Sequence, residues 1–276
     1  MLIRKQVDLP PFSANHGSME DTNIKKKSED CLDRNPERTP IQICLSGQQI
    51  TIDCCLRFNR RAIKTGPSGP DGLTYAQLIQ TGISRYWSGQ HLINTPEVPG
   101  TVSVSVVFQS PDTRRSCLIR VRPLFFMPAH VVSPFYRRLW GFFKTGQFES
   151  IGLNWSPENP GVMVLPPFEN QEIPQRVAAH EFGHLLGLGD AYGAFYRFYA
   201  NAPNTGHYIM NSRGTVQPQE VQMVLKAHKT RRMQYFPRSF QISAIRRGIK
   251  RDLLYQVHAL AGRCKKLLRT LKHSNR

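Results

Sequence analysis

The segment HEFGHLLGLGD, residues 180–190, constrains the fold of this chain more than any other part of its sequence. His180 and His184 are four residues apart, so on a helix they lie one turn apart on the same face. The apolar residues among them, Phe182 and three leucines, favour burial of this helix. Gly187 can adopt the left-handed conformation in which helices end. The sequence therefore predicts a buried helix that presents two imidazoles on one face and stops at Gly187.

Two imidazoles on one helix face can bind a single tetrahedral Zn²⁺ ion. Glu181 follows the first histidine directly, where a carboxylate can reach a metal-bound water and take its proton. The alternative is a chance HExxH sequence on a surface helix. That alternative does not account for the apolar residues in the segment, because buried and unpaired polar side chains are costly. We therefore expect His180 and His184 to bind zinc, with Glu181 as general base.

A catalytic zinc site needs a third protein ligand and one open position for water. The candidates that follow the helix are Asp190, His207 and Glu220. Gly187 breaks the helix three residues after His184, so the chain can turn back and present residue 190 to the metal. We therefore expect Asp190 as the third ligand, while His207 and Glu220 remain alternatives.

The segment 180–190 resembles the metzincin zinc signature, H-E-x-x-H-x-x-G-x-x-H, with Asp190 in place of the third histidine. An aspartate in that position is similar to the pattern of snapalysin-like peptidases. The resemblance covers roughly residues 41–225 and is specific only across the signature. It implies a metzincin-type zinc peptidase whose substrate is received by an edge strand, which residues 161–165 would form here.

The resemblance also implies a methionine turn beneath the metal, and Met210 is its match, 20 residues after Asp190. Many metzincins place a tyrosine two residues after that methionine, whereas this chain has Ser212 there and Tyr208 two residues before it. The residue that would stabilise the oxyanion is therefore unassigned. Tyr192 and Tyr208 are further candidates for a catalytic role, although tyrosines in such places are more often packing residues.

The rest of the body shows a mixture of strand and helix patterns. Alternating or β-rich runs predict strands at 49–58, 101–108, 116–122 and 161–165, and helical spacing predicts helices at 73–86 and from near Pro174 to Gly187. The turn at 111–115 makes a hairpin between the second and third strands plausible. The order of elements predicts an α+β fold, namely a zincin-like catalytic domain with a mixed sheet and a zinc-binding helix.

The charge is concentrated at the end of the chain. The net charge is +18, and residues 229–276 carry 14 Lys or Arg but a single acid, Asp252. From Ile242 the apolar residues recur at intervals of three and four, which predicts a basic amphipathic helix. Packing on the catalytic domain is one role for it. An anionic membrane surface or another acidic partner bound through 242–272 is a second, and nucleic acid is less favoured because aromatic residues are sparse there.

The beginning of the chain is polar. We expect a flexible leader at 1–40, a catalytic domain at 41–228 and the helical tail at 229–276. The sequence contains no conventional signal peptide and no transmembrane segment, so we expect a cytoplasmic protein or one exported by a non-classical route. The six cysteines form no C-x-x-C pair, and without a signal we expect reduced thiols.

These patterns together predict a zinc-dependent endopeptidase that hydrolyses peptide bonds of a peptide or protein substrate. One Zn²⁺ ion would be the cofactor, bound by His180, His184 and Asp190, and Glu181 would be the general base. The alternative is a catalytically silent zinc-binding protein that acts through its basic tail on membranes or nucleic acid. Cleavage specificity and oligomeric state do not follow from the sequence.

Overall fold

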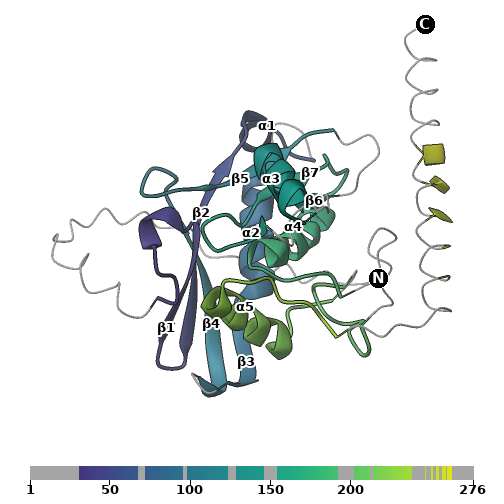
Figure 1. Cartoon of the computed structure of the whole chain (residues 1–276). Coiled ribbons are helices and arrows are strands. Elements are labelled where there is room, and N and C mark those ends of the chain that lie inside the picture. Colours follow the sequence, from purple (N-terminus) through teal and green to yellow (C-terminus); the bar gives the residue numbers. More distant parts are fainter. Residues whose placement is uncertain are drawn as a thin grey trace, which may run out of the picture.

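The computed structural model of the chain describes most of its body and part of its tail (Figure 1). The described residues are 31–67, 72–95, 98–123, 129–145, 154–191, 202–211 and 214–237, with positions 246, 250, 253, 254, 257, 258 and 260–262 of the tail. None of the helices in these ranges is long and apolar enough to cross a membrane.

A mixed sheet forms one layer of the body. Its strands are β1 (Ile41–Ser46), β2 (Gln49–Phe58), β3 (Gly89–Asn94), β4 (Pro99–Gln109), β5 (Cys117–Val121), β6 (His130–Val132) and β7 (Val162–Leu165). The order is β3-β4-β2-β5-β7-β6, and β1 pairs with the first half of β2. β2 is parallel to both β4 and β5, and β7 is parallel to β5. β1, β3 and β6 pair antiparallel with their neighbours. The expected α+β class is therefore confirmed.

The helices are η1 (Pro36–Arg38), α1 (Arg60–Lys64), α2 (Tyr75–Trp87), α3 (Phe135–Thr145), α4 (Glu172–Leu185) and α5 (Pro218–Thr230). α2 begins at a capping box in which Thr74 and Gln77 bond each other's backbone N–H groups. α2 packs against α4, and Gly82 permits the close approach: a Cβ there would lie 2.3 Å from the carbonyl oxygen of Gln175. This contact holds α4 beside the sheet.

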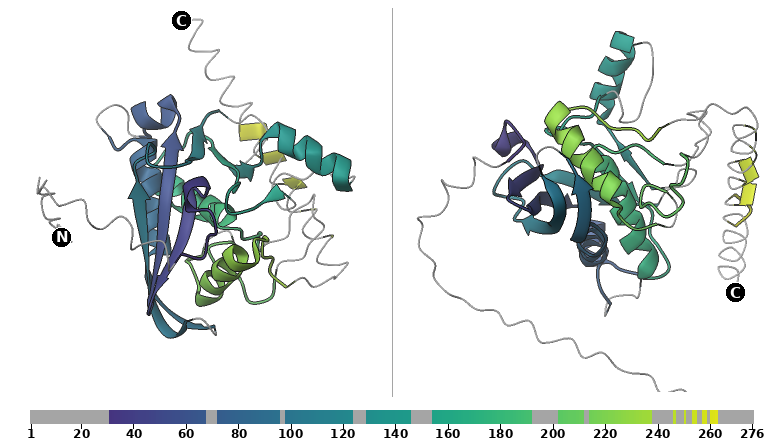
Figure 2. Two further views of the ribbon diagram at one scale, coloured as in Figure 1. Left: turned by 60° about the vertical axis from the view of Figure 1, so that its left-hand side comes forward. Right: turned by 90° about the horizontal axis from the view of Figure 1, so that it is seen from below.

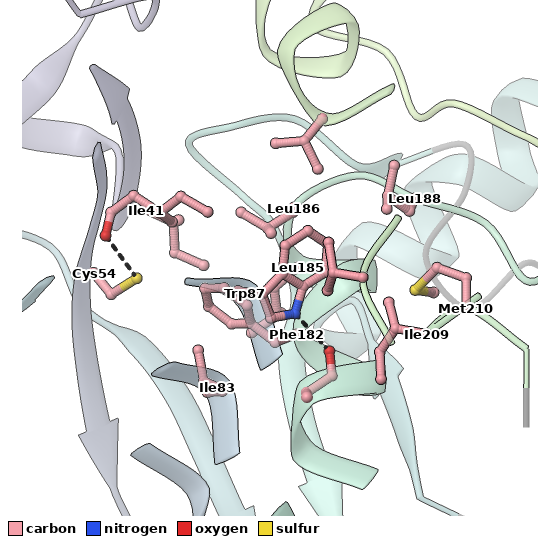
Figure 3. Close-up of a cluster of buried hydrophobic side chains, with 14 of the residues drawn as sticks. Ile41, Cys54, Ile83, Trp87, Phe182, Leu185, Leu186, Leu188, Ile209 and Met210 are labelled. Carbon is pink, nitrogen blue, oxygen red and sulfur yellow. Dashed lines mark hydrogen bonds between the residues drawn. The ribbon is translucent and has the colours of Figure 1, made fainter. Parts of the chain in front are cut away.

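Two indole groups hold α4 in the core. The Nε1 of Trp87 donates to the carbonyl oxygen of Ala179 at 2.9 Å, and that of Trp155 donates to Leu185 at 3.1 Å. Figure 3 shows Trp87 packed among Phe182 and other apolar residues of the cluster. α4 is therefore a buried helix, as the apolar residues of the sequence predict.

The predicted strands at 49–58, 101–108 and 116–122 and the helix at 73–86 are confirmed as β2, β4, β5 and α2. The hairpin between the second and third of these strands is wrong. β2 lies between β4 and β5 and is parallel to both, so the two strands run in the same direction. The connecting turn is instead tied to β2, since Arg114 Nη2 donates to the carbonyl oxygen of Asp53 at 2.7 Å.

The segment 161–165 is a strand, β7, but it is not the edge strand that the sequence suggests. β7 lies between β5 and β6, with register pairs on both sides. β6 is the last strand of the sheet in the described part of the chain. It is only three residues long and lies in a proline-rich stretch, which explains why the alternation of residue types does not reveal it.

The folded body is larger than the predicted domain of residues 41–228 at both ends. At its beginning, Cys31 forms a disulfide with Cys44, so the expectation of reduced thiols is wrong for this pair. Asp33 accepts a hydrogen bond from Nδ1 of buried His228 at 3.0 Å. The expected flexible leader is therefore structured from Cys31 onward, and residues 1–30 lie outside the described residues.

The end of the body extends to Phe236, beyond the predicted boundary at 228. Met233 and Phe236 are buried, because the chain after α5 returns to the core. The backbone of Gln234 pairs with the loop after α4: its N–H donates to Gly187 at 2.8 Å, and its carbonyl accepts from Gly189 at 2.8 Å. Residues 229–236 therefore belong to the body and support the loop that leads to Asp190.

The described tail residues are helical and exposed, including Leu253, Val257 and Leu260 of the predicted apolar stripe. Packing of these positions on the body is therefore not seen. The other residues of the stripe lie outside the described residues.

Candidate metal centre

The break after α4 forms where the sequence predicts it. Gly187 has a φ of +90°, and a Cβ at this position would lie 2.6 Å from the ring of Trp155. The N–H of Gly187 donates to His184 and the N–H of Leu188 donates to Gly183, at 3.0 and 2.9 Å. These bonds close the last turn and direct the following residues back along the helix.

This reversal brings Asp190 to the two histidines of α4. Asp190 Oδ1 lies 3.3 Å from Nε2 of His180 and 3.2 Å from Nε2 of His184. Across the described ranges, these three side chains are the group of histidine, cysteine and acidic residues whose ligand atoms lie close enough together for one metal ion, within 4.8 Å of one another. The preference for Asp190 over its alternatives therefore agrees with the geometry.

The second nitrogen of each imidazole is held by a backbone carbonyl. His180 Nδ1 lies 2.8 Å from the carbonyl oxygen of Ile209, and His184 Nδ1 lies 2.8 Å from that of Leu188. A carbonyl oxygen can only accept, so each Nδ1 carries the hydrogen. In neutral imidazoles this leaves the Nε2 lone pairs directed at Asp190. Metal-binding histidines are commonly oriented by such outer contacts.

The donor set fits a zinc ion. The two Nε2 lone pairs and the carboxylate oxygen of Asp190 repel one another unless a cation or protons lie between them. Asp190 Oδ1 is buried, and neutral imidazoles that carry their hydrogen on Nδ1 donate no hydrogen bond to it; only a protonated imidazole could. Two imidazole nitrogens and one carboxylate oxygen form a ligand set that Zn²⁺ accepts in catalytic sites.

The pKa shifts in the cluster also indicate that positive charge stabilises it. Burial disfavours a charged His180, yet its hydrogen bond to Asp190 and the carboxylates of Glu181 and Asp190 raise its pKa to about 9. Burial also opposes ionisation of Asp190, but the two histidines hold its pKa well below the usual range. In the absence of metal, protons on the imidazoles would stabilise the carboxylates of this cluster.

Glu181 lies on α4 between the two histidines and is buried. Burial raises the pKa of its carboxyl, although His184 and His180 oppose this. Its Oε2 is a buried atom that no hydrogen bond in the described ranges satisfies. The electrostatic influence of His130, on the edge strand β6, also reaches Glu181. Sequence reasoning missed His130, because only the sheet places it beside the helix.

Met210 packs against α4. It is fully buried, and a Cβ on Gly183 would lie 2.2 Å from its Sδ, so the sulfur lies against the helix at the residue before His184. The N–H of Asn211 donates to Tyr208 at 3.0 Å, which closes a turn around the methionine. The Met210 carbonyl in turn accepts from the N–H of Ala191, next to Asp190, at 2.9 Å. The turn thereby contacts both the helix and the loop that carry the candidate ligands.

Glu220 supports this turn and is not part of the cluster. Its Oε1 accepts from the N–H of Met210 at 2.9 Å, and its Oε2 accepts from Gln217 at 2.8 Å and Ile209 at 3.3 Å. Burial raises its pKa to about 7, although the three N–H groups favour the ionised form. The Ile209 carbonyl accepts the hydrogen bond of His180 Nδ1. Glu220 on α5 therefore helps to orient that imidazole through the backbone of Ile209. The sequence suggests it only as an alternative ligand.

The remaining candidates lie elsewhere. His207 is exposed, and its ring packs against Tyr208 at a centroid distance of 4.8 Å. The Tyr208 hydroxyl donates to Gln219 Oε1 at 2.7 Å, and its ring packs on Phe236, which indicates a packing role. Tyr192 and Ser212 lie outside the described residues.

Comparison of the chain with protein-family models, with curated proteins and with solved structures found no match. The resemblance to metzincins stays a prediction from residues 180–190. The geometry of His180, Glu181, His184 and Asp190 is therefore the basis for the function that follows.

Proposed function

We propose that this protein is a zinc-dependent endopeptidase, with His180, His184 and Asp190 as the metal ligands and Glu181 as the general base. The observation that supports this most strongly is the convergence of two oriented Nε2 atoms on Asp190 Oδ1, at 3.3 and 3.2 Å. Glu181 lies beside this cluster with an unsatisfied buried oxygen.

Zinc, when bound, supplies a Lewis acid that polarises the scissile carbonyl and lowers the pKa of its water to near ~7. Glu181 accepts the proton of the attacking water at its carboxylate and delivers it to the leaving amine. The carbonyls of Ile209 and Leu188 keep the two imidazoles in the tautomer that this requires. Asp190 adds a negative charge, which weakens the Lewis acidity relative to a third neutral histidine.

The substrate would lie along β6 in an extended conformation. β6 is the last strand of the described sheet, it is antiparallel to β7, and it contacts α4. Main-chain hydrogen bonds to such an edge bind a peptide largely independently of its sequence, and side-chain pockets then select among sequences. This arrangement moves the substrate-binding role from the segment 161–165 to His130–Val132.

Metal content is the first test. We expect one zinc per chain in the purified wild type by elemental analysis, a loss of zinc in Asp190→Ala, and retention in His207→Ala, which serves as the matched control. Glu181→Gln should retain zinc and lose about 10²–10⁴-fold of the hydrolysis rate on a mixed peptide substrate. A wild type without zinc after reconstitution, or full hydrolysis by Glu181→Gln, would contradict the proposal.

A second candidate function is a catalytically silent zinc protein that acts through its basic tail. The exposure of Leu253, Val257 and Leu260 favours an external partner for the tail. Deletion of residues 238–276 separates the two functions, since it spares the buried Met233 and Phe236. Hydrolysis that survives the deletion supports the peptidase, whereas binding without hydrolysis in the full chain supports the silent protein.

A further inference from the structure

The helix α3 exposes an apolar face that neither the proposed catalysis nor the tail explains. Five large apolar side chains on it are between 38% and 71% exposed: Phe135, Tyr136, Leu139, Trp140 and Phe143. Their spacing places them on one side of the helix. A contiguous apolar surface of this kind on a folded body marks a site of interaction.

α3 is attached to the body at its first turn. Arg137 Nη2 donates to the carbonyl oxygen of Asn154 at 2.7 Å, and the Arg137 N–H donates to Pro134 at 2.9 Å. Both panels of Figure 2 show the helix projecting from the rest of the body. Only Ser133 and Pro134 separate it from β6, so the projecting helix directly follows the edge strand.

The composition of α3 suits an anionic lipid surface. Its sequence, FYRRLWGFFKT, contains three basic residues and no acid. Tryptophan and tyrosine favour the boundary between headgroups and acyl chains, where one side of the ring is apolar and the other is wet. Amphipathic helices with basic residues and an aromatic face lie in that boundary without spanning the bilayer. With 11 residues, α3 is too short to cross it.

We propose that α3 binds the surface of a membrane that contains anionic lipids, with its apolar face inserted among the headgroups. The net charge of +18 attracts the chain to such a surface and opposes the association of two copies through the same face. This binding is independent of zinc and of hydrolysis. It would bring β6 close to the lipid and so favour substrates held at a membrane.

The three tryptophans of the chain provide a direct probe. Trp87 and Trp155 are buried, whereas Trp140 is 62% exposed. Insertion of α3 should therefore shift the emission of the full chain to the blue through Trp140. We expect the shift, together with co-sedimentation, for vesicles of phosphatidylcholine with phosphatidylglycerol. Vesicles of phosphatidylcholine alone should produce neither, and added salt should weaken both effects.

Substitutions on α3 test its contribution. Phe135→Ser combined with Phe143→Ser leaves the Trp140 reporter in place and should lower the partition to anionic vesicles by about tenfold or more. Ile63→Ser is the matched control, since Ile63 on α1 is 54% exposed and is also apolar. The control should bind as the wild type does. Zinc content and thermal unfolding of all three proteins establish that each is folded.

Four results would overturn the proposal. The first is the absence of binding to anionic vesicles. The second is co-sedimentation without a change in Trp140 emission, and the third is equal partition of the wild type and the α3 variant; either would assign binding to the tail. The fourth is a wild-type dimer in solution that the α3 substitutions dissociate, which would assign the apolar face to a second copy of the chain. None of these results bears on hydrolysis, so the peptidase proposal is tested separately.

Discussion

Replacement of Glu220 by glutamine should weaken the proposed zinc binding, although Glu220 does not lie among the candidate ligands. The carboxylate accepts three backbone N–H groups, from Met210, Gln217 and Ile209. The amide of glutamine has only one acceptor oxygen, and its NH₂ group takes the place of the second carboxylate oxygen and faces the N–H donors that this oxygen had accepted. If the oxygen replaces Oε2, the N–H of Met210 loses its acceptor and faces a second donor.

The magnitude follows from these contacts. One buried donor without a partner costs about 1–3 kcal/mol, and the two remaining bonds lose the assistance of the negative charge. A total of about 2–4 kcal/mol corresponds to a decrease in Tm of roughly 4–16 °C for a body of this size. Because the Ile209 carbonyl orients His180, we also expect zinc affinity to fall about 10–100-fold, as for other outer contacts of metal ligands.

The assay is competition for zinc against a chromophoric chelator, with thermal unfolding followed by circular dichroism. Measurements at pH 8 keep the wild-type carboxyl ionised, since burial raises its pKa only to about 7. Glu172→Gln is the matched control, because Glu172 is an exposed acid in the first turn of α4. If Glu220→Gln and the control bind zinc with the affinity of the wild type, the connection from α5 through the turn to His180 does not exist.

Two further predictions concern stability. A Cβ at Gly183 would lie 2.2 Å from Met210 Sδ, so Gly183→Ala should lower the free energy of unfolding by about 1–3 kcal/mol, measured by chemical denaturation. Gly206→Ala is the control, because no atom lies within 4 Å of its added Cβ. Equal losses in the two variants would refute the contact. Burial alone would raise the pKa of Glu158, but its hydrogen bond and ion pair with Arg231 lower it below its ordinary value of 4.5. A carboxyl whose pKa is depressed in the folded state stabilises the fold above its ordinary pKa, and this stabilisation is lost as the pH falls. The difference in unfolding free energy between the wild type and Glu158→Gln should therefore shrink below about pH 4.5 in urea titrations. A difference that stays constant with pH would contradict this.

The helix α4 shows how much local sequence information can predict. His180, Glu181 and His184 share a helix face because of their spacing alone. Gly187 ends that helix because a glycine tolerates its φ of +90° at little cost. The return of the chain to Asp190 follows from these two features. The sequence is therefore sufficient to predict the cluster of candidate ligands, whose members all lie within 11 consecutive residues.

The sheet shows the opposite case. β4 and β5 are recognisable as strands, but their partner, β2, lies more than 40 residues earlier in the chain. Alternation of residue types predicts that a strand exists and which face is buried, and it contains no information about its neighbours. The hairpin between β4 and β5 and the edge position of 161–165 were wrong for this reason.

The amino-acid sequence by itself determined the elements whose signals are local: the helix α4, its end at Gly187, the candidate ligands and the basic tail. Only the tertiary structure decided what depends on contacts between distant residues. It paired Asp33 with His228, placed β6 at the edge of the sheet against α4, and made Glu220 a hydrogen-bond acceptor for the turn at Met210. The physical reason is that spacing along a helix is set by backbone geometry, whereas the partner of a buried charge or a strand edge is set by how the whole chain packs.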